Sequence, residues 1–353
     1  MKIAITADVH LKRHNETPER YRALENIFEQ IKQSGIEYLI IAGDLFDRDF
    51  SNYADFDSLC KNFPSIKISI IPGNHDYQIS NKLFVSSNIE VLNETKIKEI
   101  EGMSVLFIPY NPKNSMDEVL SEFAHEKPIQ EKWILIGHGD YITGNRELNP
   151  YEPGFYMPLT TKAILRHNPL RVFLGHIHKP SDFGRVFYPG SPCGLDITET
   201  GKRRFLVYDT IADHVEDIIV NTDKIYFNET ITLLPSEEQE DFINKKIIQM
   251  VEGWNVNQQE LSKASVRLSL KGYVRDLRET MEIFLNILSN TGINLYEKDG
   301  LDISEIKILK EIDSDRLYLL EKVKEKMEKI EISNQQAPRE KILQKAMELI
   351  FSD

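Results

Sequence analysis

Five short polar segments of this 353-residue chain carry side chains of the types that bind divalent metal ions. Each follows an apolar run, and together they hold five of the nine histidines in the company of aspartate, asparagine and glycine. The segments are 7–10 (A-D-V-H), 43–47 (G-D-L-F-D), 73–76 (G-N-H-D), 137–140 (G-H-G-D) and 175–178 (G-H-I-H). One such segment alone often just ends a strand, whereas five in this order predict a shared metal site.

The ligand types narrow both the metal and the reaction. A mixture of imidazole, carboxylate and amide oxygen without thiolate suits Mn²⁺, Fe²⁺ or Zn²⁺ and disfavours calcium. The seven candidate ligands in these segments are too many for one ion that keeps an open coordination position. They predict two ions bridged by a carboxylate, about 3.5–4 Å apart. Such a pair orients a water molecule, lowers its pKa and holds a phosphodiester for in-line attack.

Strands and helices alternate from residue 1 to about residue 222, and this alternation is expected to bring the segments together. A helix begins after Thr17, which can cap it, with Pro18 in its first turn, and ends near Gly35. The carboxyl ends of strands form one rim, where glycines allow sharp turns. The predicted architecture is a layered α/β sandwich of two facing sheets with helices outside. The short β-branched runs that predict its first strands are 2–7, 38–42, 66–71, 104–108 and 133–136.

Two further parts are expected after a boundary near residues 221–234. Residues 235–310 alternate helices with short strands, one of them closed by Gly272, and predict a small α+β domain. Residues 313–353 predict a helical pair interrupted at 333–338, whose first helix has an apolar stripe at Leu320, Val323, Met327 and Ile330. This pair either packs on its own domain or receives the helices of a partner.

Composition sets outer limits on function. The net charge of −13 argues against a protein that grips nucleic acid with its whole surface, although a local strip or a basic partner would still allow a nuclease. The sequence contains no run of about 18 apolar residues, so we expect no membrane span. No secretory signal is visible, so a cytoplasmic protein is expected. Cys60 and Cys193 are expected to be reduced thiols.

The ordered set D-x-H, G-D, G-N-H-D, G-H and G-H-x-H resembles the calcineurin-like metallophosphoesterase superfamily over residues 1 to about 210. The resemblance implies a four-layer α/β/β/α metallophosphoesterase sandwich that binds two divalent metal ions. It also implies that His75 is the general acid, or stabilises the charge of the leaving oxygen, and that Asp76 orients it. The metal ligands that it implies are Asp8, His10 and His178 for the first ion, Asn74, His138 and His176 for the second, and Asp44 as the bridge.

Within that superfamily the chain is most similar to the SbcD-type nuclease subunits. The similarity rests on the G-D-L-F-D run at 43–47, the Y-P-G-S turn at 188–191, the small α+β domain and the terminal helical pair. It implies a Mn²⁺-dependent DNA exonuclease and endonuclease that acts in double-strand break repair as a homodimer. Residues 235–310 would then be a DNA-capping domain, and residues 313–353 would bind an SbcC-like coiled-coil ATPase. No P-loop motif occurs, so any ATP dependence would come from that partner.

Several alternatives stay open at this stage. The loop after Asp47 departs from the Pro-rich pattern of the SbcD type, and relatives carry histidine where this chain has Asp47, so its role is open. Arg48, Lys179 and Arg185 could contact phosphates, or they are ordinary solvated loop residues. The tripeptide 202–204 (K-R-R) is interpreted as a turn. The other functional hypotheses are a free-standing phosphodiesterase or phosphatase acting on a small molecule, and a non-catalytic scaffold.

Overall fold

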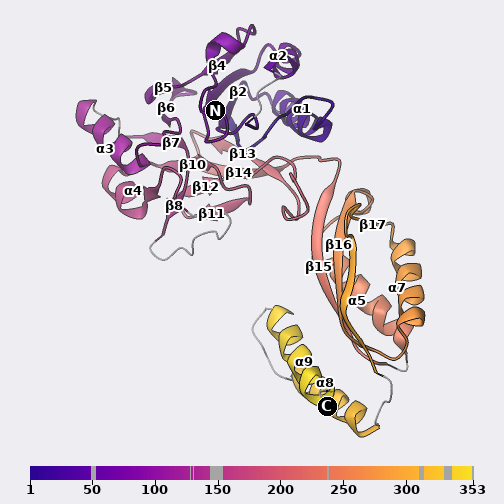
Figure 1. Cartoon of the computed structure of the whole chain (residues 1–353). Coiled ribbons are helices and arrows are strands. Elements are labelled where there is room, and N and C mark those ends of the chain that lie inside the picture. Colours follow the sequence, from indigo (N-terminus) through magenta and orange to yellow (C-terminus); the bar gives the residue numbers. More distant parts are fainter. Residues whose placement is uncertain are drawn as a thin grey trace. The chain divides into compact units, whose positions relative to one another are not determined.

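A computed structural model describes residues 1–48, 53–127, 129, 131–143, 154–236, 238–309, 314–329 and 336–351. The chain forms two compact units (Figure 1). Unit 1 contains Met1–Leu195 and Lys202–Asp223, and unit 2 contains Asp196–Gly201 and Lys224–Asp353. Each unit has its own hydrophobic core and is described by itself.

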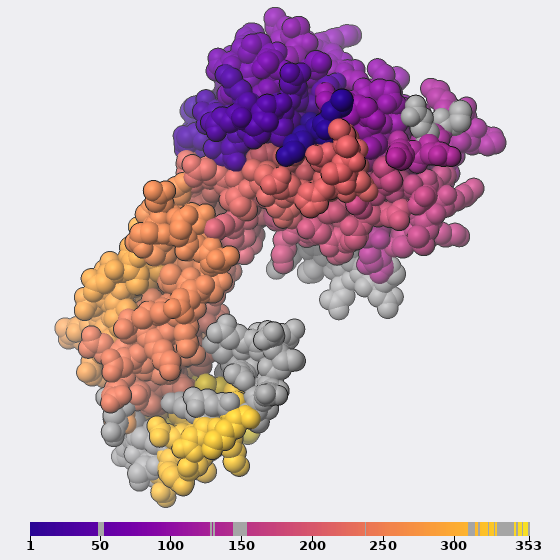
Figure 2. Space-filling view, turned by 180° about the vertical axis from the view of Figure 1, so that it is seen from behind, coloured from indigo at the N-terminus to yellow at the C-terminus, as the bar shows by residue number. Residues whose placement is uncertain are grey.

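The first sheet of unit 1 is built around the N-terminal strand. Parallel strands follow one another on one side of it, and the late strand β13 (Arg204–Asp209) pairs with it antiparallel on the other. Figure 2 shows the first residues of the chain beside those around 210, where Thr210 N–H donates to the carbonyl of Met1. In spatial order the strands are β14 (His214–Ile219), β13 (Arg204–Asp209), β1 (Lys2–Thr6), β2 (Tyr38–Ala42), β3 (Lys67–Ile71) and β4 (Ile89–Val91).

The second sheet of unit 1 also has six strands, and its central strands β6, β7, β10 and β12 run parallel. In spatial order they are β11 (Ser181–Phe183), β12 (Val186–Tyr188), β10 (Arg171–Gly175), β7 (Trp133–His138), β6 (Met103–Ile108) and β5 (Lys96–Ile100). Two short strands, β8 (Tyr141–Ile142) and β9 (Leu159–Thr160), pair separately beyond β7.

The two sheets pack face to face. Successive side chains of a strand point alternately into the core between the sheets and toward the helices outside. In β1, Ile3 and Ile5 join the core between the sheets, whereas Ala4 faces the helices. Helices α1 (Pro18–Gln33) and α2 (Tyr53–Lys61) cover the first sheet. Helices α3 (Met116–Glu126) and α4 (Thr161–His167) cover the second. The four-layer α/β/β/α sandwich expected from the sequence is therefore confirmed.

The start of α1 differs in one detail from the expectation. Thr17 is at the N-cap position and Pro18 opens the helix, but the Thr17 hydroxyl makes no capping hydrogen bond. Instead Thr17 Oγ1 accepts from the backbone N–H of Lys12 at 3.2 Å. Thr17 thus ties the first turn of α1 to the loop that carries the first polar segment.

Unit 2 is a small α+β structure around a parallel sheet. The segment taken as a boundary in the sequence contains a nine-residue strand, β15 (Ile225–Leu233), which pairs with β16 (Ala264–Val274) along its whole length. Gly272 lies inside β16 rather than ending it; its φ is +111°, and a Cβ there would lie 2.2 Å from the Leu233 carbonyl oxygen. The other elements are α5 (Gln239–Gly253), α6 (Gln258–Leu261), α7 (Leu277–Thr291), β17 (Asn294–Leu295) and β18 (Leu301–Ile308).

The terminal helices α8 (Ser314–Lys329) and α9 (Gln336–Phe351) pack on unit 2. Leu320 of α8 and Met347 and Phe351 of α9 form an apolar cluster with Leu234 and Tyr273. Ile330, expected in the apolar stripe, lies outside the described residues. Helix α9 begins at Gln336, so Pro338 lies in its first turn. In the described part of the chain, no helix is both long enough and apolar enough to cross a membrane.

Candidate metal centre

All five polar segments lie at the carboxyl ends of strands and meet at one rim of the sandwich. The segments after β1, β2 and β3 come from the first sheet, and those after β7 and β10 come from the second. Parallel pairing places β2 between β1 and β3, and β10 beside β7. Side chains that are up to about 170 positions apart in the sequence therefore lie together at this rim.

Four of the predicted ligands have a left-handed backbone, which is uncommon for residues other than glycine. The φ angles of Asp8, His10, Asp44 and His176 are 54°, 51°, 51° and 99°. Such conformations cost on the order of 1–3 kcal/mol each and persist where the surroundings impose them. Here Asp8 N–H donates to the carbonyl of Gly43 at 3.1 Å, and His10 N–H to that of Asp44 at 3.0 Å. These backbone hydrogen bonds are the surroundings that hold Asp8 and His10 in this conformation.

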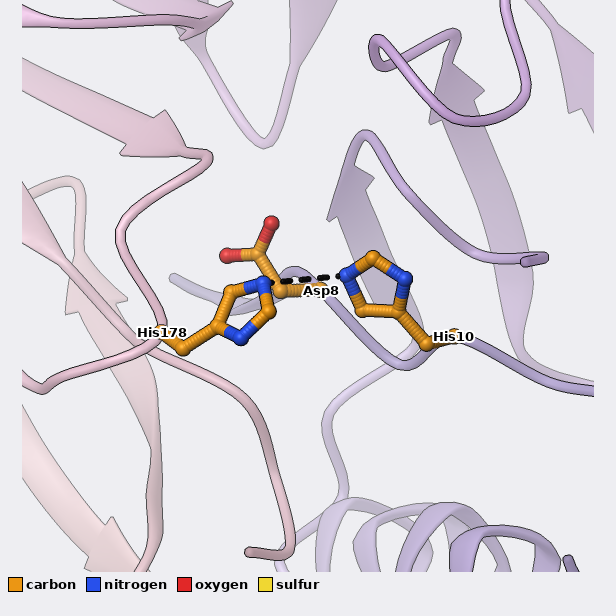
Figure 3. Close-up of side chains that lie close together, drawn as sticks. All are labelled: Asp8, His10 and His178. Atoms are coloured by element: carbon orange, nitrogen blue, oxygen red, sulfur yellow. Dashed lines mark hydrogen bonds between the residues drawn. The ribbon is translucent and has the colours of Figure 1, made fainter. Parts of the chain in front are cut away.

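Asp8, His10 and His178 form the first half of the centre (Figure 3). The Nε2 atoms of His10 and His178 face each other at 3.0 Å. Asp8 Oδ1 accepts from His176 N–H at 2.8 Å, whereas its buried Oδ2 has no hydrogen-bond partner among the described residues. A buried carboxylate oxygen without a donor, beside two imidazole nitrogens, fits a divalent cation.

Asn74, His138 and His176 form the second half. Asn74 Oδ1 lies 2.9 Å from His138 Nε2 and 3.1 Å from His176 Nδ1. His138 is fully buried, and its Nδ1 lies 2.9 Å from the carbonyl of Ala42. Donation from Nδ1 to that carbonyl leaves the lone pair of Nε2 for a metal, the usual way in which a protein selects the tautomer of a ligating histidine.

Asp44 lies between the two halves. Its Oδ2 is 3.7 Å from His10 Nε2 on one side and 3.3 Å from His138 Nε2 on the other. Its Oδ1 accepts from the backbone N–H of His75 at 2.8 Å. One carboxylate thus contacts both groups of ligands, as a bridge between two ions must.

Burial and mutual charge set the protonation of the centre. Burial raises the pKa of Asp8 to about 6 and lowers the pKa of His10 to about 3. Burial also lowers the pKa of His138, but Asp44 and Asp8 outweigh it and raise that pKa to about 9. A divalent cation would compete with protons for these buried groups, so metal affinity should rise with pH.

Two glycines allow the loops to approach this closely. A Cβ on Gly73 would lie 2.2 Å from Asp44 Oδ1, and a Cβ on Gly43 would lie 2.2 Å from His138 Nδ1. Any side chain at either position would displace a predicted ligand.

His75 lies beside the first half, and its partner is Asp47. The ring of His75 meets that of His10 edge to face at 4.7 Å. Its Nδ1 lies 3.4 Å from Asp47 Oδ1, and Lys12 Nζ lies 3.3 Å from Asp47 Oδ2. The hydrogen bond with His75, helped by other contacts, holds the pKa of Asp47 well below its usual range.

The prediction that Asp76 orients His75 is corrected by this geometry. Asp76 is fully buried, and its Oδ1 accepts from Gly73 N–H at 2.7 Å while its Oδ2 accepts from Phe46 N–H at 3.2 Å. Burial raises the pKa of this carboxyl to about 7. Asp76 therefore joins the loops after β2 and β3, and the ring nitrogen of His75 meets Asp47.

The three basic residues suggested as phosphate contacts lie in different places. Arg48 and Lys179 are exposed next to the second and fifth segments. Arg185 lies beside the amino end of β10, opposite the rim, and Arg185 Nη1 donates to Asn168 Oδ1 at 2.8 Å and to the carbonyl of Pro169 at 2.9 Å. Arg185 therefore lies at the end of the sheet opposite the candidate metal ligands, which argues against a phosphate contact.

Three residues at the centre were not anticipated. Lys12 contacts Asp47, Arg20 donates from Nη1 to the carbonyl of His10, and Arg203 donates to the carbonyl of His178 at 3.0 Å. Arg203 is 2% exposed, although its tripeptide was interpreted as a turn. No sequence motif points to them, because each acts on groups that only the fold brings near.

The family model described as calcineurin-like phosphoesterase matches residues 1–180. No curated protein matches the chain. Among solved structures, a novel archaeal phosphodiesterase is similar at 16% identity and a TM-score of 0.34, covering 62% of this chain and 100% of its own. A hypothetical protein from Thermus thermophilus is similar at 14% identity and a TM-score of 0.41, covering 62% of this chain and 98% of its own. The nuclease MPE from Pseudomonas putida is similar at 17% identity and a TM-score of 0.28, covering 61% of this chain and 86% of its own.

Proposed function

The chain belongs to the calcineurin-like phosphoesterase family, and from this premise we propose that it is a two-metal phosphodiesterase that cleaves DNA. The observation that carries the proposal is the position of Asp44. Its Oδ2 lies 3.3 Å from a ring nitrogen of His138 and 3.7 Å from one of His10, so one carboxylate reaches both sets of ligands. That arrangement suits two ions that share one carboxylate.

Each half of the centre has a complete set of ligands for one cation. Asp8, His10 and His178 would hold the first, and Asn74, His138 and His176 would hold the second. When bound, the two ions would neutralise the phosphate charge and lower the pKa of a water molecule. The donor set suits Mn²⁺ and also fits Fe²⁺ or Zn²⁺. The orphaned Oδ2 of Asp8 supports this assignment.

His75 protonates the leaving oxygen. Its Nδ1 donates to Asp47, which leaves Nε2 for the substrate. As the P–O bond breaks, the electron pair passes to the leaving oxygen and the proton moves there from Nε2. The Asp47 carboxylate stabilises the protonated ring and orients it, and Lys12 fixes the carboxylate from the other side at 3.3 Å.

DNA and an SbcC-like coiled-coil ATPase are the proposed substrate and partner, with a role in double-strand break repair as a cytoplasmic homodimer. The G-D-L-F-D run and the Y-P-G-S turn support this, together with the α+β unit and helical pair that follow them. On the pair, Tyr318, Leu319 and Ile342 are 62%, 53% and 48% exposed although apolar, which supports helix binding there. Residues 235–310 would act as the DNA-capping domain.

A small-molecule phosphodiester or phosphomonoester is the second candidate substrate. The net charge of −13 favours it, because an acidic surface repels polyanions. A non-catalytic scaffold would be expected to have lost metal ligands, whereas all seven candidate ligands are present in this chain, which argues against that alternative.

The decisive experiment compares substrates with the purified full chain and Mn²⁺. Linear duplex DNA, single-stranded DNA and bis(p-nitrophenyl) phosphate are each incubated with wild type, His75→Ala and the surface control His125→Ala. Wild type and His125→Ala should degrade DNA, and His75→Ala should lose roughly 10²–10⁴-fold in rate while keeping its metal. Intact DNA beside rapid cleavage of the aryl diester would refute the nuclease assignment. No cleavage of either would refute phosphodiester hydrolysis.

Partner binding is tested separately in the full chain. Leu319→Glu on α8 should weaken binding of a coiled-coil ATPase fragment without lowering the rate on the aryl diester. Leu285→Glu on α7, a leucine that is 45% exposed, serves as the control for the same added negative charge outside the helical pair. Equal affinity for wild type and Leu319→Glu would exclude this face of the helical pair.

A further inference from the structure

The two histidines that face each other across the first half of the centre share a feature beyond their side chains. The backbone carbonyl of each accepts a hydrogen bond from an arginine. Arg20, in the first turn of α1, donates to His10, and Arg203, just before β13, donates to His178. The side chain of Arg20 is 12% exposed and Arg203 is 2% exposed, so both guanidinium groups are largely out of water.

The carbonyl of His178 is held from several directions. Arg203 Nη1 lies 3.0 Å from it, and Ser191 N–H donates to it at 3.1 Å. A Cβ on Gly190 would lie 2.5 Å from this oxygen, and Gly190 has a φ of +77°. The turn at 188–191 therefore folds closely around the His178 carbonyl, with Arg203 on the same oxygen.

His10 is held at both of its peptide groups. Its N–H donates to the carbonyl of Asp44 at 3.0 Å, and its carbonyl accepts from Arg20 Nη1. Its φ of 51° is a left-handed conformation that needs such support. With the backbone fixed on both sides, the imidazole has little freedom apart from rotation about its own side-chain bonds.

We propose that Arg20 and Arg203 are positioning residues that fix the gap between the His10 and His178 imidazoles through the backbone carbonyls, and thereby set the affinity of the first metal position. The Nε2 atoms lie 3.0 Å apart. A shift of either peptide plane would move a ring and open this gap. The inference rests on the proposed two-metal centre, but it concerns residues outside the ligand set.

The direction of the effect separates positioning from plain electrostatics. Both arginines carry positive charge close to a site that would bind a cation. If their charge were what matters, its removal would strengthen metal binding, because like charges repel. If positioning matters, removal weakens binding despite the lost repulsion. The two accounts predict opposite signs.

The test measures Mn²⁺ binding to the full chain without substrate, by isothermal titration calorimetry after metal removal. Arg203→Met and Arg20→Met remove the charge and the donors but keep a long side chain. Arg185→Met is the control for Arg203, since Arg185 also donates to a backbone carbonyl but at the opposite end of the sheet. Arg22→Met is the control for Arg20, because Arg22 lies in α1 and pairs with Asp223.

One of the two Mn²⁺ binding steps should weaken roughly 10–100-fold in Arg203→Met and in Arg20→Met, as for other groups that hold ligands in place. The other step and both controls should stay within about twofold of wild type. Arg203→Lys keeps the charge but lacks the rigid fork, so it should lose about three- to tenfold. The visible absorption spectrum of the Co²⁺-loaded protein should change in the variants with weakened binding only.

Unchanged or tighter Mn²⁺ binding in the Met variants would overturn the proposal. Thermal melting in EDTA verifies that the variants fold. If the Met variants do not fold, Arg203→Lys decides the question, and wild-type affinity in that variant overturns the proposal. Failure of the wild type to bind two Mn²⁺ ions would refute the proposed centre itself, which is a separate outcome.

Discussion

Asp47→Asn tests the proposed catalytic pair directly. Asp47 Oδ1 lies 3.4 Å from His75 Nδ1, and its Oδ2 is fixed by Lys12 at 3.3 Å. Asparagine keeps the shape and an acceptor oxygen but removes the negative charge. The variant therefore isolates the electrostatic support that the carboxylate gives to the protonated ring of His75.

The size of the effect follows from solvent exposure. The side chains of His75 and Asp47 are 24% and 27% exposed, so water screens their attraction. Partly exposed ion pairs contribute up to about 1 kcal/mol, which corresponds to about a fivefold change in rate. His75→Ala, by contrast, should cost roughly 10²–10⁴-fold, the range for loss of a general acid.

The assay is steady-state hydrolysis of bis(p-nitrophenyl) phosphate with saturating Mn²⁺, with bound metal quantified for each variant. Because Asp47 acts through His75, the double variant should be no slower than His75→Ala alone. Effects that multiply in the double variant would refute the pairing. A fall in metal content in Asp47→Asn would also refute it, since it would make Asp47 part of the metal site.

Three further outcomes are expected. Asp76→Ala leaves the N–H groups of Gly73 and Phe46 without their buried acceptor. Urea unfolding should therefore show a free energy of unfolding that is lower by about 2–6 kcal/mol, at about 1–3 kcal/mol per group. A decrease of less than about 1 kcal/mol would contradict this. Gly73→Ala places a methyl group 2.2 Å from Asp44 Oδ1, so calorimetric titration should show lost Mn²⁺ binding with an unchanged far-ultraviolet circular dichroism spectrum. Met347→Ala should destabilise unit 2 by about 2–5 kcal/mol in scanning calorimetry and leave Mn²⁺ binding intact.

The convergence of the metal ligands could be predicted because it depends on strand ends alone. Any residue directly after a central parallel strand lies at the same rim, so Asp8, Asp44 and His138 needed no further information. Contacts among the loops depend on how each loop folds beyond the rim. Proximity in the sequence thus predicts Asp76 as the partner of His75, whereas the backbone turn directs Asp76 toward Gly73 and Phe46 and leaves Asp47 near the ring.

The predictions for Arg185, β15, Arg20 and Arg203 depend on how the strands are arranged in space, which the sequence does not show. Arg185 follows the fifth segment by only a few residues, but the chain reverses through β11 and returns, so Arg185 lies at the amino end of β10. Strand β15 comes shortly after Asn221, Thr222 and Asp223, which are typical of turns, and its centre is the polar run N-E-T, so the sequence indicates a linker there. Arg20 and Arg203 act on backbone carbonyls, which carry no sequence signature.

We propose that Asp44 bridges two metal ions between His10 and His138. Anomalous diffraction from crystals grown with Mn²⁺ tests it most directly, with data collected near the manganese absorption edge. Two peaks are expected about 3.5–4 Å apart, one beside Asp8 and His178, the other beside Asn74 and His176, with Asp44 contacting both. A single peak, or peaks that Asp44 does not contact, would contradict the account.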